Sequence, residues 1–401
     1  MRTNLGWRLD PAVTFLNHGS YGACPAPVLD AQQALRQRLE EEPVRFLSGD
    51  LPGLLAEARM RVGAFLGADP DGLAFVSNAT TGVNTVLQSL RFAPGDELLT
   101  DDHEYNATIN SLRAVAARDG ARVVIARIPF PIGGPAEDLD AMLGAVTERT
   151  RLVLVSHVTS PTALVLPVAD LVAELDRRGI DTLVDGAHAP GMVPVDVGAL
   201  GAAYWTANGH KWLCGPKGSA VLWVREDRRE RIHPLVVSHG ANEPLTNRTR
   251  FRAEFDWTGT SDPTAALSLP TAIEWMASSA PGGGGWAEVM RANRELVLAA
   301  RDRLAAALGV EAPAPDSMLG SMAALPVPGL TDDEAATALG RALEAEDHIQ
   351  VPIGGWPVRA AWAGDGPDKV LIRVSAQRYN EPGDYDRLAE ALSRRLGRLA
   401  H

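Results

Sequence analysis

Short apolar runs alternate with amphipathic segments along most of this chain. The apolar runs lie at 73–77, 97–100, 122–128, 151–157 and 182–186, and segments with helical spacing of apolar residues lie between them, near 80–90, 106–118, 136–146 and 167–178. Parallel strands need such crossover helices, which then cover both faces of the sheet. The alternation therefore predicts an α/β fold with a mostly parallel central sheet, to which two further strands at 202–207 and 219–224 belong.

The pattern changes after residue 262. We expect helices at 263–278, 287–308, 331–345 and 381–398, and strands near 321–326, 348–353 and 370–376. A chain of 401 residues exceeds the size at which one core usually stops growing. The sequence thus predicts an N-terminal segment (1–25), a large α/β domain (26–262) that begins with helices at 26–41 and 52–66, and a smaller α+β domain (263–401).

Composition excludes several classes of protein. The net charge is −12 and no Lys/Arg run compensates for it, so we expect no nucleic-acid partner. Cys24 and Cys214 are the only cysteines and form no CxxC pair, which favours a reducing cytoplasm, and no metal site is expected. The N-terminus lacks the apolar region of a signal peptide, and the most apolar stretch, 152–173, is interrupted by polar residues and prolines, so no membrane span is expected.

Lysine is rare in this chain: only Lys211, Lys217 and Lys369 are present. A lysine amine can lose its proton and attack a carbonyl, whereas a guanidinium stays protonated. The scarcity is equally explained by a genome that favours arginine codons. It nevertheless leaves three candidates for a reactive amine, of which Lys369 is expected to be an exposed loop residue.

The segment 183–224 carries the most specific chemistry. Asp185 lies at the carboxyl end of a predicted strand, where open α/β sheets bind ligands, and Lys211 follows in a loop between two strands. A pyridoxal phosphate enzyme needs such a pair, because the lysine forms a Schiff base with the cofactor and the carboxylate keeps the pyridine nitrogen protonated. Taken alone, Asp185 would be better explained as a helix or turn cap and His188 as a structural histidine.

An ordered set of motifs resembles one family along nearly the whole chain. The motifs include FLNHGSYGACP (15–25), FVSNATTGVNTVL (75–87), DDHEYNA (101–107), VSHVTSPTALVLPV (155–168), VDGAHAPG (184–191), NGHKWLCGPKG (208–218), FDWTGTSDPTA (255–265) and LIRVSAQRYN (371–380). The chain resembles class V of the fold-type I pyridoxal-phosphate aminotransferase superfamily, and within it the isopenicillin N epimerase-like group. This resemblance implies pyridoxal 5'-phosphate as the cofactor and an amino-acid-type small molecule as the substrate.

The resemblance also implies a role for individual residues. Lys211 would be the Schiff-base lysine, in preference to Lys217, because the family places the reactive amine directly after a histidine, here His210. Asp185 would pair with the pyridine nitrogen and His188 with the ring hydroxyl. The expected phosphate contacts are Ala79, Thr80, Asn208 and His210, although relatives often have serine at the position of Asn208. Tyr105 would stack on the cofactor, or is a half-buried tyrosine at a helix start.

Further residues match substrate and partner positions of the family. Arg373 would grip the substrate α-carboxylate, and His18 and Ser160 would contact the substrate. Thr260 matches the segment that reaches the phosphate of a neighbouring subunit, which implies a homodimer with shared active sites. The loops at 17–22, 238–242 and 349–370 would determine side-chain specificity.

Several reactions remain open at this point. Removal of the Cα proton can lead to epimerisation, to C–S β-elimination from a cysteine conjugate or to transamination, and a non-catalytic protein would be expected to lose Lys211 or Asp185. Epimerisation needs a second acid, for which Tyr105 and His18 are candidates. The stretch 349–370 contains no cysteine, which disfavours the persulfide chemistry of cysteine desulfurases. Cys214 is expected to be a packed thiol.

Overall fold

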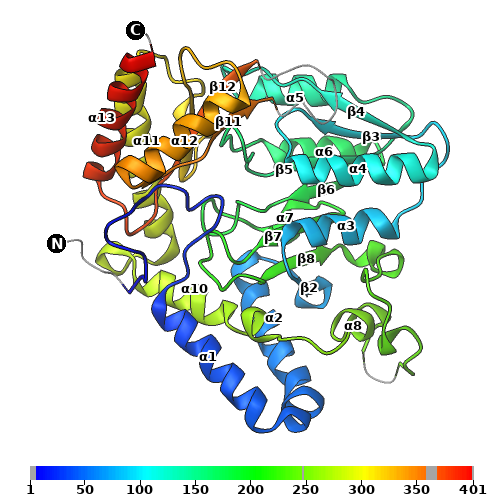
Figure 1. The fold of residues 1–401 in the computed structure, drawn as a ribbon. Coiled ribbons are helices and arrows are strands. Elements are labelled where there is room, and N and C mark those ends of the chain that lie inside the picture. The colour runs from blue at the N-terminus through cyan, green and yellow to red at the C-terminus, as the bar shows by residue number, and fades with distance from the viewer. Residues whose placement is uncertain (1–5, 246–247, 358–367, 400–401) are drawn as a thin grey trace.

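A seven-stranded sheet forms the centre of the protein (Figure 1). The computed structural model describes residues 6–245, 248–357 and 368–399. The strand order is β2-β8-β7-β6-β5-β3-β4, and only β8 runs antiparallel to its neighbours. The strands are β2 (Leu73–Val76), β3 (Glu97–Asp101), β4 (Arg122–Ala126), β5 (Thr150–Ser156), β6 (Asp181–Asp185), β7 (Tyr204–Asn208) and β8 (Ala220–Val224).

Helices cover both faces of this sheet, whereas the last three helices, α11, α12 and α13, pack with the C-terminal strands and with one another. In chain order the helices of the described residues are α1 (Ala26–Glu41), α2 (Leu51–Leu66), α3 (Ala79–Ser89), α4 (Asn106–Asp119), α5 (Pro135–Gly144), α6 (Val168–Arg177), α7 (Val197–Leu200), α8 (Arg250–Phe255), α9 (Thr264–Leu267), α10 (Leu269–Ser278), α11 (Gly285–Leu308), α12 (Asp333–Asp347) and α13 (Pro382–Leu399). Among the described residues, none of these helices is long and apolar enough to cross a membrane.

The strand residues alternate between two hydrophobic clusters. In β5, Leu152 and Leu154 pack with residues of α3 and α4, whereas Val153 and Val155 pack with residues of α2, α5 and α6. Successive side chains of a strand point to opposite faces, so a strand that is apolar throughout fits a sheet covered on both sides. The predicted α/β class with a mostly parallel sheet is confirmed.

The C-terminal part forms a small antiparallel sheet of order β11-β12-β9. Its strands are β9 (Met322–Pro326), β11 (Ile353–Trp356) and β12 (Lys369–Ser375), and the separate pair β1 (Thr14–Phe15) and β10 (Ile349–Gln350) ties the N-terminal segment to it. The single strand predicted at 348–353 is wrong, because the chain leaves one sheet after Gln350 and enters the other at Ile353. Pro352, which has no N–H to donate, lies at this change.

The helix predicted at 263–278 is also divided. It consists of α9 and α10, with Ser268 between them. Pro270 lies in the first turn of α10 and cannot donate the backbone hydrogen bond that would continue α9. The division into three chain segments at residues 25 and 262 stays a prediction.

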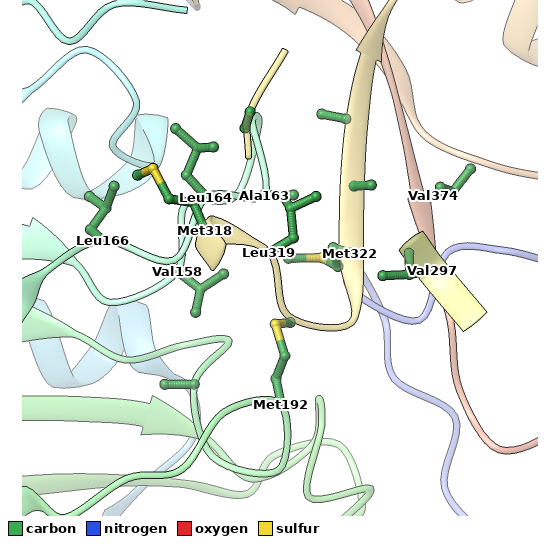
Figure 2. Packing of buried hydrophobic residues seen from close by; sticks show 14 of the residues in the cluster. Val158, Ala163, Leu164, Leu166, Met192, Val297, Met318, Leu319, Met322 and Val374 are labelled. Carbon is green, nitrogen blue, oxygen red and sulfur yellow. The ribbon is translucent and has the colours of Figure 1, made fainter. Parts of the chain in front are cut away.

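The small sheet is packed onto the chain that follows β5 (Figure 2). Figure 2 shows Val158, Ala163 and Leu164 beside Met318, Leu319 and Met322. Leu164 forms a β-bridge with Leu319, and the Val165 N–H donates to the Met318 carbonyl at 2.8 Å. This packing fixes β12 close to the carboxyl ends of the central strands.

Helix α3 approaches β7 so closely that only glycine fits at position 82. A Cβ there would lie 2.0 Å from Thr206 Oγ1 and 2.8 Å from Thr206 Cβ. We expect Gly82→Ala to lower the free energy of unfolding by about 1–3 kcal/mol, because a buried helix is pushed off the sheet. Urea unfolding followed by circular dichroism measures the change.

Gly340 provides the matched control for this substitution. It lies inside α12, and a Cβ there would meet no atom within 4 Å. Gly340→Ala should raise the free energy of unfolding by about 0.5–1 kcal/mol, since alanine is the better helix former. Equal unfolding midpoints for the two variants would contradict the close contact between α3 and β7.

Candidate active site

A cavity of about 290 Å³ opens where β5, β6 and β7 end. The strand register places Ser156 opposite Asp185 and Asp185 opposite Thr206, so the ends of the parallel strands meet at one edge. Ligands of open α/β sheets bind at this edge. The cavity is lined by Ser20, Tyr21, Asn78, Ala79, Thr80, Tyr105, Ser156, Val158, Ser160, Asp185, Ala187, His188, Asn208, His210 and Lys211.

Asp185 lies at the floor of this cavity with only 4% of its surface exposed. Its Oδ1 accepts the Ala187 N–H at 2.9 Å, and Thr108 Oγ1 donates to Oδ2 at 3.5 Å. Burial raises the pKa of Asp185, although the Ala187 N–H and the nearby Lys211 act in the opposite direction. A buried carboxylate of this kind gains stability from a cationic or N–H-bearing ligand.

Lys211 extends into the cavity from the loop between β7 and β8. Its Nζ lies 3.0 Å from His188 Nε2, and Trp212 Nε1–H donates to His188 Nδ1 at 3.3 Å. An indole N–H can only donate, so the proton of the neutral imidazole lies on Nε2, facing the amine. Burial, and then the positive charge of Arg373, lower the pKa of Lys211 to about 7. A substantial fraction of the amine is therefore neutral near neutral pH.

The N-terminus of α3 forms one wall of the cavity. Asn78 caps the helix by accepting the Thr81 N–H at 2.7 Å, and Thr80 contributes a first-turn N–H that has no acceptor within the helix. The Ala79 N–H instead donates to Asn208 Oδ1 at 2.8 Å. Ala79 and Asn208 are thus bonded to each other here. Thr80 and the Asn208 amide group remain as the donors that this wall offers to an anion.

Arg373 lies beside this cavity and is 7% exposed. It donates from Nη1 to Ser160 Oγ at 3.1 Å and from Nη2 to Ser20 Oγ at 2.8 Å, and Nη1 also contacts the Ser160 carbonyl. No carboxylate of the described residues forms an ion pair with it, and its Nε has no hydrogen-bond partner among them. Burial lowers its pKa to about 10. A buried cation without a counter-ion is a strong anion site.

His18 does not line the cavity. Its imidazole is fully buried beneath the lysine loop, 3.0 Å from the Lys211 carbonyl through Nε2 and 2.8 Å from Tyr379 Oη through Nδ1. Burial lowers the pKa of His18 to about 3, so the ring is neutral. The structure therefore places His18 as a support for the backbone of Lys211, out of reach of the substrate contact and acid role expected for it.

Thr260 also lies outside the cavity of its own chain. It is exposed on the loop between α8 and α9, whose neighbouring residues line a different hollow of about 350 Å³. Apart from Arg373, which lies beside the cavity, the other residues predicted for the site are brought together around it: Ala79, Thr80, Tyr105, Ser160, Asp185, His188, Asn208, His210 and Lys211.

The two other lysines are used structurally. Lys217 donates from Nζ to the Gly22 carbonyl, and Gly22 packs so tightly on the lysine loop that a Cβ would lie 2.6 Å from the Lys211 carbonyl oxygen. Lys369 is not an exposed loop residue as expected. It begins β12 and donates to the Phe130 carbonyl at 2.8 Å, with its ammonium over the rings of Phe130 and Trp356.

Sequence reasoning missed several residues of the cavity. Asn78 was detectable as a capping residue just before the helix predicted near 80–90, and Ser156 as a polar residue near the carboxyl end of the strand predicted at 151–157. Glu104 does not line this cavity but holds two residues that do: it is 2% exposed, accepts the Tyr105 N–H at 2.7 Å and accepts from Ser156 Oγ at 3.0 Å. Burial raises its pKa well above the usual range. Its neighbour Tyr105 marked the segment, but nothing in the sequence signals that the carboxyl group turns inward.

The donor set fits pyridoxal phosphate and does not resemble a metal site. Thr80 and Asn208 suit the phosphate, the buried Asp185 carboxylate suits a protonated ring nitrogen, and the Lys211 amine suits an aldehyde. No group of three metal-ligating side chains occurs in the described ranges.

We predict that one lysine of the cofactor-free protein titrates at about pH 7. With three lysines in the chain, [ε-¹³C]lysine NMR resolves each amine, and Lys211→Ala assigns the signal by its loss. Arg373→Gln should raise this pKa, because removing a nearby positive charge favours the ammonium form. An unchanged titration midpoint in Arg373→Gln would show that the guanidinium does not act on the amine.

Comparisons with known proteins agree with this arrangement. The chain is 39% identical to isopenicillin N epimerase of Amycolatopsis lactamdurans over 96% of this chain and 95% of that protein. It is 30% identical to a probable chloroplastic L-cysteine desulfhydrase of Arabidopsis thaliana over 96% and 83%. The fold matches the cysteine desulfurase CsdA of Escherichia coli with a TM-score of 0.80 at 24% identity, over 98% and 97% of the two chains.

A family model described as aminotransferase class-V matches residues 23–388, which is most of the chain. The chain therefore belongs to the aminotransferase class-V family and is an enzyme that depends on pyridoxal phosphate.

Proposed function

We propose that the protein epimerises the Cα of an amino-acid or peptide-like substrate, in the manner of isopenicillin N epimerase. The observation that carries the proposal is one cavity lined by both the Lys211 amine, which is partly neutral near neutral pH, and the buried Asp185 carboxylate. Beside this cavity lies Arg373, which has no counter-ion among the described residues. When bound, pyridoxal phosphate would supply the electron sink for a carbanion at Cα. Two epimerases among the relatives, at 39% and 36% identity, support the choice of reaction.

In this proposal Lys211 moves the proton on one face of the substrate. A base works best when its pKa lies near the operating pH, and the pKa of Lys211 is lowered to about 7. Arg373 would hold the α-carboxylate, and a bidentate guanidinium contact would orient the Cα–H bond toward the amine. Ser20 and Ser160 keep the guanidinium in place.

Tyr105 is our candidate for the acid on the opposite face. It lines the cofactor cavity, remains 48% exposed and has its backbone N–H held by Glu104. The alternative, His18, is enclosed beneath the lysine loop with both ring nitrogens occupied. Tyr105 could also stack on the cofactor, as the family resemblance implies, and both roles need its ring at this wall.

A C–S β-lyase acting on a cysteine conjugate is the second candidate function. The L-cysteine desulfhydrase relatives favour it, because elimination begins with the same proton removal. Desulfurase chemistry is disfavoured: Cys24 and Cys214 are buried, line no part of the cofactor cavity, and have thiol pKa values raised by burial. A transaminase comes third and a non-catalytic protein last.

We also propose a homodimer with shared sites that works in the cytoplasm, in antibiotic or other secondary metabolism. Thr260 lies on an exposed loop, where it could reach the phosphate of a partner subunit. Nearby, Val236 and Val237 expose 56% and 79% of their surfaces. Exposed apolar residues next to such a loop are typical of a covered interface.

The proposed function predicts that Lys211 is the lysine that binds the cofactor. Borohydride reduction of the loaded protein followed by peptide mapping should attach the cofactor mass to the peptide containing Lys211. The attachment should disappear in Lys211→Ala and persist in Lys217→Ala, whose amine is committed to the Gly22 carbonyl. Attachment that survives in Lys211→Ala would overturn the assignment.

The second prediction separates the reactions. With isopenicillin N in D₂O, the protein should incorporate deuterium at Cα and form the D-configured product with the substrate skeleton intact. Tyr105→Phe should retain exchange into the L-configured substrate but form the D product about 100-fold more slowly, a typical loss for a general acid. Release of a free thiol and a pyruvate-like product from a cysteine conjugate, with no change of configuration, would favour the lyase instead.

A further inference from the structure

A second cavity of about 270 Å³ adjoins the cofactor cavity. The two share Ser20, Tyr105 and Ser160 as lining residues, and Arg373 lies on the wall of the second. A substrate whose carboxylate rests on Arg373 and whose Cα faces Lys211 therefore has this cavity beside it. The remaining lining residues are Glu104, Asn106, Pro161, Pro352, Ile353, Gly354, Gly355, Trp356 and Leu371.

The strand pairing of β11 with β12 determines what stands next to Arg373. Gly354 is paired directly with Leu371, and Trp356 with Lys369. Directly opposed residues of an antiparallel pair share a face, as do residues two apart on one strand. Gly354 and Trp356 therefore lie on the same face as the guanidinium, in rows about 6.6–6.8 Å apart.

The row nearest to Arg373 is left open by glycine. A Cβ at position 354 would meet no atom of the described residues within 4 Å, so these residues leave room there for a side chain that glycine lacks. Trp356 closes the far row, where its ring contacts His103 and Phe130 at centroid distances of 4.8 and 5.4 Å. The result is a trough that starts at the guanidinium, passes over Gly354 and ends at an indole.

The charged side chains in and beside the trough already have partners or a proposed role. Glu104 has both oxygens engaged, by the Tyr105 N–H and Ser156 Oγ, and burial favours its neutral form. Lys369, in the row of Trp356, donates to the Phe130 carbonyl and does not line the cavity. Arg373 is needed for the α-carboxylate. A side-chain charge near Cα would therefore enter a largely apolar space in which the described residues offer no free counter-ion, which is strongly unfavourable.

We propose that this cavity is the side-chain subsite of the enzyme and that it selects amino acids whose side chain is long and, in the part near Cα, uncharged and largely apolar, over amino acids with a small side chain or a charge near Cα. Gly354 and Trp356 determine its specificity, the first by leaving space and the second by ending it. The inference rests on the proposed action at Cα and adds the class of substrate to it. It also implies that free cysteine, which is too short to reach the indole, fills the trough poorly.

The test uses the holoenzyme and amino acids that lack a Cα hydrogen, so that binding is measured without turnover. Isothermal titration calorimetry gives dissociation constants for α-methylnorleucine, α-methylglutamate and 2-aminoisobutyrate. We expect the norleucine analogue to bind at least about tenfold more tightly than each of the other two, since a well-filled apolar pocket discriminates by about 10–200-fold.

Gly354→Leu should fill the trough. It should abolish most of the preference for α-methylnorleucine and leave the binding of 2-aminoisobutyrate within about twofold of wild type, because the carboxylate site is untouched. Gly340→Leu, a matched substitution in open space on α12, should change neither value. Gly354→Ala should give an intermediate loss and covers the case in which the leucine variant does not fold.

Three results would overturn the proposal: equal binding of the three probes to wild type, an undiminished preference in the folded Gly354 variants, or equal loss of both the long and the short probe. Since the probes have no Cα hydrogen to lose, these outcomes are independent of epimerisation. A product of unchanged configuration would refute the proposed epimerisation but not the proposed subsite. Any of the three binding results named above would refute the subsite but not the epimerisation.

Discussion

The burial of ionisable groups at the carboxyl edge of the central sheet is the constraint on which the rest of the structure depends. Parallel strands in register end together, so the side chains that follow β5, β6 and β7 are forced into one small volume. There, removal from water raises the pKa of Asp185 and lowers the pKa of Lys211. Both pKa shifts disfavour the charged forms, the Asp185 carboxylate and the Lys211 ammonium. A cofactor with a positively charged ring nitrogen would stabilise the carboxylate again, and the Lys211 amine can exchange protons near neutral pH.

A second layer keeps the amine in this position. The N-terminal segment lies against the lysine loop, where His18 bonds the Lys211 carbonyl and Gly22 packs on the same backbone. Tyr379, from the segment after β12, holds the other ring nitrogen of His18. Three parts of the chain that are distant in sequence thus meet behind one residue. A loop supported from behind can present its lysine with little loss of conformational freedom on binding.

The small sheet brings the buried positive charge of Arg373 to the same place from another direction. Arg373 reaches the rim of the cavity because β9 and β12 pack against the chain after β5 through Leu164, Met318 and Leu319. The same sheet carries Gly354 and Trp356 on the face of the guanidinium. In the proposed function, the binding of the α-carboxylate and the recognition of the side chain would thereby be coupled through two adjacent strands. Changes in specificity could then occur on β11 without altering Lys211 or the residues around it.

Much of this protein follows from its sequence alone. Local periodicity is a short-range property, so the alternating helices and strands, the mostly parallel sheet and the carboxyl-edge position of Asp185 were predictable. The motif that contains His210 favours Lys211 over Lys217 as the Schiff-base lysine, and this choice stays a prediction. Tertiary structure decided what depends on long-range pairing. It buried His18 beneath the lysine loop, turned Glu104 inward, and divided 348–353 between two sheets at Pro352. It also placed Gly354 beside Arg373. Strand register decides which side chains share a face, and register is set by partners far along the chain, which no local pattern contains.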